Sequence, residues 1–481
     1  MKCSRSFFCF SFVLLSASLF AQSGYEYQPS QQDESKLADS KNKLDLWQKE
    51  QYKEISGKDY KEFHKERHEH LVNKIETGYY IYDDFFYVRL NKILQKIIAS
   101  NPNYTNLDNT EILVERSVVP NAACYGNGIM VFNLGLISRL QNDDQLAFVI
   151  SHELSHQILN HVDGSVKNKI DYLDSKEYKN KIKSIKNLEY NNNTVYESFL
   201  LDLSLKSSGR TRQKEREADS LAIVLLQNTN YKLNESLNLL AILDISDEPK
   251  YADTIDYKTQ FSADSYEFQD AWLLKRNGLA VQQEYDQELI DSLKTHPDCD
   301  LRISLLEKNF KLPPLQKHEI ESVFKEVTIH SDFELIHSDL LDGRYGRVIE
   351  NGFVLQNYYP DNDFLTAAIG ISLAEIYFAQ KNHSLRQFVP LPDDDYNMNY
   401  HRILLMINNI RLSDLKKVTL AYYNKNEGIK STSHDEQNEH LAYASYLYLK
   451  LKNSELLEKT KTDYLTLYPQ GFFINKLKTN K

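Results

Sequence analysis

A long apolar helix pattern between residues 142 and 159 places the strongest constraint on the fold. Asn142 can cap the start of this helix, and Gln145 stands where a capping box needs it. A helix with apolar side chains around most of its circumference should be buried. The apolar residues of this helix are Leu146, Ala147, Val149, Ile150, Leu154, Ile158 and Leu159. Since buried polar groups need partners, the His152, Glu153 and His156 of this helix are candidates for a functional site.

The three polar residues form the pattern HExxH, as His152-Glu-Leu-Ser-His156. Two histidines four positions apart lie on one helix face and can bind one zinc ion. Glu153 is rotated by about 100° from His152, so it can reach a water molecule beside the metal without being a ligand. The pattern predicts one zinc ion per chain, with Glu153 as general base.

A third metal ligand has to come from elsewhere in the chain. His161 stands one place short of the third histidine in HExxHxxGxxH, and the glycine of that pattern is missing. We therefore interpret His161 as a helix-end histidine. A second helix carries Glu215 and Asp219 on one face, with Glu217 pointing away from them. One of the two carboxylates can bind metal while the other hydrogen-bonds a ligand imidazole.

The two patterns together resemble a known family. HELSH followed by EREAD is similar to the gluzincin family of the CAAX prenyl endopeptidase and HtpX, and within it to the soluble periplasmic BepA-like metalloproteases with a tetratricopeptide repeat domain. The Thr295-His-Pro297 segment with Arg302 is similar to a Thr-His-Pro…Arg motif of the BepA-like members. The resemblance covers about residues 79–308. Its shared pattern, HExxH then ExxxD, falls on His152, Glu153, His156, Glu215 and Asp219.

The resemblance implies a zinc-dependent endopeptidase in which Glu215 is the third ligand, with Asp219 and Arg302 supporting the ligands. It also gives His296 one of two roles. This histidine would either stabilise the oxyanion or occupy the fourth zinc position and hold the enzyme inactive until it moves.

A substrate-binding strand also follows from the resemblance. Asn121, Ala122 and the strand near Gly128 lie where the family has an edge strand beside the active-site cleft. An extended peptide could add to this edge as a further strand.

The chain should be mostly α-helical with a small sheet, because glycine and proline are scarce, at 15 and 11 of 481 residues. Apolar spacing predicts a helix over 79–98, strands over 111–116 and 128–133, and then the helix with HExxH. This is an α+β zincin-type peptidase domain. Helix pairs over 346–358 and 364–380, and a helical run over 441–467, predict an α-helical domain resembling tetratricopeptide repeats.

Four segments follow from these patterns. Residues 1–21 have the layout of a signal peptide, and 22–78 are charged lead-in helices. Residues 79–310 form the peptidase domain, with an insert at about 162–211 that is either a helical hairpin or a lid. Residues 311–481 form the helical repeat-like domain.

Two smaller features have a structural and a functional interpretation. His64 and His68 lie one helical turn apart within a charged run, which we interpret as a solvent-facing helix rather than a metal site. Cys124 and Cys299 could form one disulfide in an exported protein and hold the loop of His296 across the cleft.

The leading function is an exported endopeptidase, periplasmic or extracellular, that acts on proteins or peptides such as misfolded envelope proteins. The C-terminal domain could dock an envelope protein partner. A net charge of −11 without a basic stripe argues against nucleic acid as a partner, and no later apolar run is long enough to span a membrane. The alternative is a chaperone or adaptor whose repeat-like domain does the work while His296 silences the zinc site.

Overall fold

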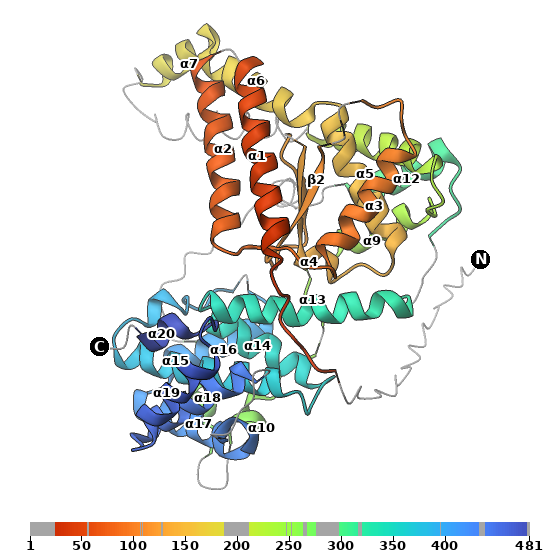
Figure 1. Cartoon of the computed structure of the whole chain (residues 1–481). Helices are drawn as coiled ribbons and strands as arrows, with labels where there is room; N and C mark the ends of the chain where they lie inside the picture. Colours follow the sequence, from red (N-terminus) through yellow and green to blue (C-terminus); the bar gives the residue numbers. More distant parts are fainter. Residues whose placement is uncertain are drawn as a thin grey trace, which may run out of the picture. The chain divides into compact units, whose positions relative to one another are not determined.

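The computed structural model in Figure 1 divides into two compact units. The sheet unit comprises Tyr27–Ala252 and Leu274–Arg344, and the helical unit comprises Met1–Glu26, Asp253–Leu273 and Tyr345–Lys481. The structure describes residues 25–54, 57–105, 107, 109–126, 128–186, 211–246, 248–251, 253–262, 267–275, 298–315, 320–394, 396–431 and 438–478. The predicted signal peptide lies outside these residues. Among them, no helix is long and apolar enough to cross a membrane.

A four-stranded mixed sheet has the order β1-β2-β4-β3. Its strands are β1 (Tyr80–Ile81), β2 (Glu111–Glu115), β3 (Ala122–Cys124) and β4 (Ile129–Asn133). Strands β2 and β4 are parallel, with Leu113 opposite Val131, while the two outer pairs are antiparallel. Four of the five residues in both β2 and β4 are buried, as expected of strands covered on both faces. Both predicted strands are confirmed to within a residue.

The helix predicted from residue 79 begins later. Helix α3 spans Tyr87–Ala99, whereas Tyr80 and Ile81 form β1. The Asp83 carboxylate accepts hydrogen bonds from the backbone N–H groups of Phe86 at 2.7 Å and Tyr87 at 3.2 Å, so it satisfies amides that the start of a helix leaves free. The early part of the prediction was wrong because apolar residues before this cap contact the core without being helical.

The helix with HExxH is α5, Asp143–Ile158. The Asn142 side chain accepts from the backbone N–H of Gln145 at 2.9 Å, which confirms the predicted cap. Helix α5 packs against α3, α9 (Glu235–Asp244) and strand β3. A helix over 211–227 follows the insert in sequence, and α12 (Cys299–Phe310) packs on α9. Helices α4 (Leu134–Ile137) and α13 (Ser322–Leu341) pack together. The mostly helical fold with a small sheet confirms the predicted fold class.

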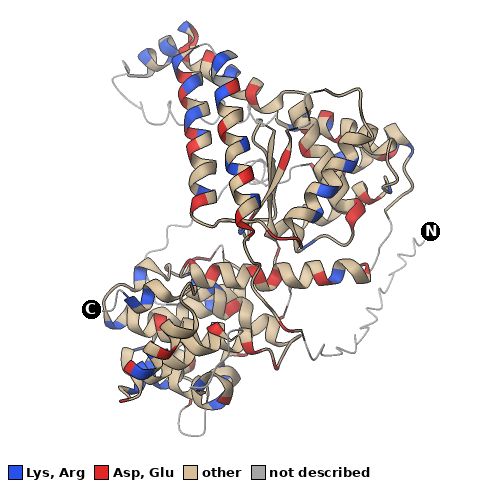
Figure 2. Ribbon diagram, in the orientation of Figure 1, with Lys and Arg blue, Asp and Glu red and all other residues tan. Residues whose placement is uncertain are grey.

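The lead-in segment forms two packed helices, α1 (Glu34–Glu54) and α2 (Lys58–Glu76). They cover the sheet, since Leu44 and Leu71 share an apolar cluster with residues of β1, β2 and β4. Lys or Arg and Asp or Glu alternate along both helices in Figure 2. His64 is nevertheless buried, with Nδ1 2.6 Å from a guanidinium nitrogen of Arg67. The solvent-facing interpretation was wrong for His64, because this face of α2 packs inward.

The insert begins with two helices that contact each other, α6 (His161–Asp174) and α7 (Lys176–Lys186). Residues 187–210 lie outside the described part of the chain. Whether the insert acts as a lid stays a prediction.

The predicted helix pair over 346–358 and 364–380 is confirmed in the helical unit, as α14 and α15. The helical run predicted over 441–467 consists of two helices, because Asn453 adopts a left-handed φ of 52° and ends the first of them. The elements of this unit are α10 (Tyr257–Phe261), η1 (Asp270–Leu273), α14 (Tyr345–Gln356), α15 (Asp363–Lys381), η2 (Leu385–Gln387), α16 (Met398–Asn409), α17 (Leu412–Lys425), η3 (Glu427–Lys430), α18 (Glu439–Lys452), α19 (Leu457–Leu467) and α20 (Ile474–Lys478).

The bounds of the compact units differ from those of the predicted domains. Helix α13, which follows residue 310, belongs to the sheet unit, while Asp253–Leu273 belongs to the helical unit. The repeat-like character of the helical unit stays a prediction.

Candidate metal centre

Helix α5 brings two imidazoles to one face. The Nε2 atoms of His152 and His156 lie 3.1 Å apart, as the four-residue spacing leads one to expect. His152 is buried, with 8% of its surface exposed, and His156 is partly buried.

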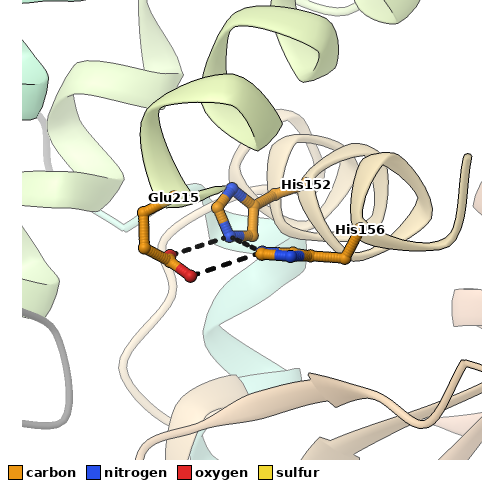
Figure 3. Close-up of side chains that lie close together, drawn as sticks. All are labelled: His152, His156 and Glu215. Atoms are coloured by element: carbon orange, nitrogen blue, oxygen red, sulfur yellow. Dashed lines mark hydrogen bonds and ion pairs between the residues drawn. The ribbon is translucent and has the colours of Figure 1, made fainter. Parts of the chain in front are cut away.

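A carboxylate from the helix over 211–227 faces both rings, as Figure 3 shows. Glu215 Oε2 lies 3.2 Å from Nε2 of His152, and Glu215 Oε1 lies 3.4 Å from Nε2 of His156. One donor atom of each residue lies within 4.8 Å of the others, the only such group of three found among the described residues. The structure therefore assembles the predicted ligand set, choosing Glu215 rather than Asp219 as the carboxylate that faces both rings.

The spacing of these donor atoms fits a tetrahedral zinc ion. Zinc binds nitrogen and oxygen ligands at about 2.0 Å, and a tetrahedron with such bonds has edges of about 3.3 Å. The three separations, 3.1, 3.2 and 3.4 Å, are close to that edge, with the two histidine nitrogens facing different oxygens of the Glu215 carboxylate. Two imidazoles with one carboxylate also leave one tetrahedral position for water or substrate, as in catalytic rather than structural zinc sites.

Asp219 and Arg302 support the first imidazole from behind. His152 Nδ1 lies 2.9 Å from Asp219 Oδ1, so Nε2 is left to face Glu215. Arg302 of α12 donates two hydrogen bonds of 2.7 Å to the Asp219 carboxylate, and Asp219 and Arg302 are both buried. The structure thus places Asp219 and Arg302 where the sequence predicted, and adds a contact of Arg302 with Glu215 at 3.6 Å.

The second imidazole has neighbours that sequence reasoning missed. Nδ1 of His156 lies 3.0 Å from Nδ1 of His161, and Nε2 of His161 lies 3.1 Å from Glu217 Oε2. His161 is not the end of α5 but the first residue of α6, after Leu159 and a left-handed Asn160. The available signal was a histidine five residues after His156 together with a third acidic residue in EREAD.

Glu153 lies beside the three donors but is not one of them. Its side chain is buried, and burial raises the pKa of its carboxyl group to about 7. The backbone N–H of Cys124 in β3 donates a hydrogen bond to this carboxyl group and partly opposes that shift. A carboxyl group with a pKa near neutrality is suited to accept and return a proton.

The pKa values of the two histidines are shifted in opposite directions by their neighbours. Burial disfavours a charge on His152, but hydrogen bonds to Asp219 and Glu215 outweigh it and raise the pKa of His152. Burial and the neighbouring His152 lower the pKa of His156 to about 3. The pKa of Glu215 is lowered because contact with His152 outweighs burial. In the metal-free site the two carboxylates thus favour a proton on His152, and metal binding at Nε2 would oppose it.

The edge of the sheet near this site is β3, not the strand that follows Gly128. Gly128 precedes β4, which has β2 on one side and β3 on the other, so the prediction of a substrate-binding edge at Gly128 was wrong. Ala122 begins β3, and Asn121 immediately precedes it, its carbonyl accepting from the N–H of Asn133. Two of the three predicted edge residues thus lie at the sheet edge.

His296 and the Thr295–Pro297 segment lie outside the described residues. The cysteines proposed to anchor this segment, Cys124 and Cys299, are both free thiols. The disulfide hypothesis is therefore not supported. Burial raises the pKa of the two thiols to about 12 and about 11, respectively.

Comparison with known families gives one match over this part of the chain. Residues 88–309 match the model of peptidase family M48. The match includes α5, the helix over 211–227 and Arg302. It therefore contains His152, His156 and Glu215, which we call the donor set, together with the supporting residues Asp219 and Arg302. It supports a metallopeptidase, and thus a hydrolase. A comparison with curated proteins finds no significant match.

Proposed function

We propose that the chain is a zinc-dependent endopeptidase. The observation that carries the proposal is the meeting of His152, His156 and Glu215 at tetrahedral spacing. The neighbouring Glu153 explains why the site is catalytic, because a structural zinc site has no use for a buried carboxyl group outside the donor set.

A bound zinc ion would supply Lewis acidity, which polarises the scissile carbonyl group and lowers the pKa of a water molecule. Glu153 takes the proton of the attacking water and passes it to the leaving amine. Asp219, held by Arg302, fixes the orientation of His152. These residues would activate a water nucleophile, carry its proton to the leaving amine and hold the metal ligands rigid, which peptide hydrolysis requires.

The open edge of β3 is the proposed docking site for an extended peptide. The backbone of Asn121 and of Tyr125 bonds to β4, at 3.0 and 2.8 Å. Since alternate residues of a strand point their backbone groups to opposite sides, those of Ala122 and Cys124 point to the free edge. The N–H of Cys124 already bonds to Glu153, which leaves the Cys124 carbonyl and the backbone groups of Ala122 for a peptide. A peptide added along β3 would therefore pass beside the general base.

The substrates that we propose are exported or misfolded envelope proteins, by the resemblance to BepA-like proteases, with His296 as the residue that restrains the site. The helical unit would dock a protein substrate or partner. The adaptor alternative is not favoured, because the family match falls on the donor set rather than on the helical unit.

Removal and return of zinc test the proposed activity. We expect the purified chain to cleave an unfolded protein, to lose this activity after dialysis against a chelator, and to regain it with one equivalent of zinc per chain. Mass analysis of the products should show internal cleavage. Cleavage that persists without metal, or a zinc-loaded and folded chain that cleaves none of a panel of unfolded proteins, would contradict the proposal.

A further inference from the structure

The side chains behind His156 form a chain of hydrogen bonds that neither the HExxH nor the ExxxD pattern includes. We propose that His161 and Glu217 are positioning residues that fix the tautomer and ring orientation of His156, so that its Nε2 is ready to bind metal. This inference rests on the proposed zinc site. It assigns the second imidazole a support that matches the one Asp219 gives to His152.

Three residues, Glu217, His161 and His156, are connected in this order by hydrogen bonds. Glu217 Oε2 lies 3.1 Å from Nε2 of His161, and Nδ1 of His161 lies 3.0 Å from Nδ1 of His156. The other nitrogen of His156, Nε2, lies 3.4 Å from Glu215 Oε1. The two nitrogens of His156 thus have separate tasks, one facing the donor set and one facing His161.

The chemistry of the groups determines where the protons lie. An ionised carboxylate only accepts hydrogen bonds, so Nε2 of His161 must donate to Glu217. A neutral His161 then has its lone pair on Nδ1 and must accept from Nδ1–H of His156. That leaves the lone pair of His156 on Nε2, which is the tautomer that binds metal at this atom.

The reverse arrangement would prevent metal binding. If Nδ1 of His161 donated to His156, a neutral His156 would carry its proton on Nε2, the atom that faces Glu215. The Glu217 carboxylate excludes this arrangement for a neutral His161, because no proton is then left for Nδ1. The acidic residue at the far end of the chain therefore selects the tautomer of the ligand.

The backbone places His161 for this role. Helix α5 ends at Ile158, and Asn160 with a left-handed φ of 53° turns the chain into α6. Lys214 Nζ donates to the backbone carbonyl of His161 at 2.9 Å. Lys214, Glu215 and Glu217 lie on one helix. This helix therefore supplies the metal ligand Glu215, the carboxylate of Glu217 that bonds to His161, and Lys214, which holds the backbone of His161.

Burial of His161 and a hydrogen bond from Gln213 to Glu217 hold these hydrogen-bonded side chains in place. His161 is 7% exposed, so water competes little for its nitrogens. The Glu217 side chain is 46% exposed, but Gln213 donates to its other carboxylate oxygen at 2.8 Å. A merely structural His161 would contribute to folding without affecting metal affinity, and this difference can be measured.

Zinc affinity of the full chain is the test. We expect His161→Phe to weaken zinc binding by about 10–100-fold, the usual effect of removing a partner of a ligand histidine. Glu217→Gln should weaken zinc binding less. Its amide oxygen can still accept from Nε2–H of His161, but its amide N–H can also donate to that nitrogen, which would favour the opposite tautomer. His161→Asn should recover part of the loss, since its amide oxygen can accept from His156.

Competition with a chromophoric chelator gives the affinity, and the visible spectrum of the cobalt-substituted chain reports ligand geometry independently of activity. His68→Phe is the matched control, because His68 pairs with Asp45 at 3.1 Å in a contact between α2 and α1 that includes none of His152, His156 and Glu215. It should leave zinc affinity unchanged. Equal affinities of the wild-type and folded His161→Phe chains would overturn the inference, as would an equal loss in His68→Phe.

Two outcomes separate this inference from the proposed function. If the wild-type chain binds no zinc, the proposed function fails. If it binds zinc and cleaves protein, but both Glu217→Gln and His161→Phe retain full affinity, only the positioning role fails. Should His161→Phe not fold, Glu217→Gln and His161→Asn decide the question.

Discussion

Replacing Glu153 with Gln should lower the rate of peptide hydrolysis by about 10²–10⁴-fold, the contribution typical of general acid–base catalysis. The expected cause is loss of the proton acceptor alone. Gln has the size of Glu, and its amide oxygen can still accept from the N–H of Cys124. Zinc affinity should be retained because Glu153 is outside the donor set.

The comparison requires kcat/KM, zinc content and thermal stability of the same preparations. Glu326→Gln is the matched control, because Glu326 is an exposed glutamate of the same unit, and it should leave all three unchanged. A Glu153→Gln chain that keeps its zinc and at least a third of the wild-type rate would remove Glu153 from the mechanism.

Replacing Arg302 with Met should lower the free energy of unfolding of the sheet unit by about 3–5 kcal/mol, the usual cost of breaking a buried ion pair from one side. Asp219 is 1% exposed and Arg302 is 4% exposed, and two 2.7 Å hydrogen bonds join them. The variant leaves the Asp219 carboxylate buried beside only the His152 ring. Urea unfolding of the metal-free chain measures the loss without the contribution of zinc binding.

Two further variants define this effect. Arg216→Met removes an exposed arginine from the helix that carries Asp219, and it should change the free energy of unfolding by less than about 0.5 kcal/mol. The double variant Asp219→Asn with Arg302→Met should be less destabilised than the sum of the single changes, because neither charge is left unpaired. Additive effects, or a loss below about 1 kcal/mol for Arg302→Met, would show that the pair contributes little.

The sequence was most informative where local chemistry decides structure. The cap at Asn142 and the strands over 111–116 and 128–133 follow from short-range patterns, and the structure has them within a residue. The start of α3 was missed because Tyr80 and Ile81 pair with β2, a contact between distant residues. The end of α18 was missed because a single left-handed Asn453 interrupts an apolar pattern that continues through it.

The same distinction applies to the site. His152, His156, Glu215 and Asp219 could be placed because helical spacing fixes which residues share a face. Neither His161 nor Glu217 could be assigned a role in this way. Their contact depends on the turn at Asn160 and on the packing of α6 against the helix over 211–227. Neither feature can be predicted from the periodicity of apolar residues. His64 was misjudged for a related reason, since its charged neighbours conceal an inward face of α2.

We infer that His152, His156 and Glu215 hold one zinc ion, and native mass spectrometry of the full chain measures this occupancy. The measurement compares the chelated chain with the same chain after zinc is returned. We predict a mass increase of one zinc per wild-type chain and none for His156→Phe at the same zinc concentration. A wild-type chain that gains no zinc, or a His156→Phe chain that gains it equally well, would contradict the claim.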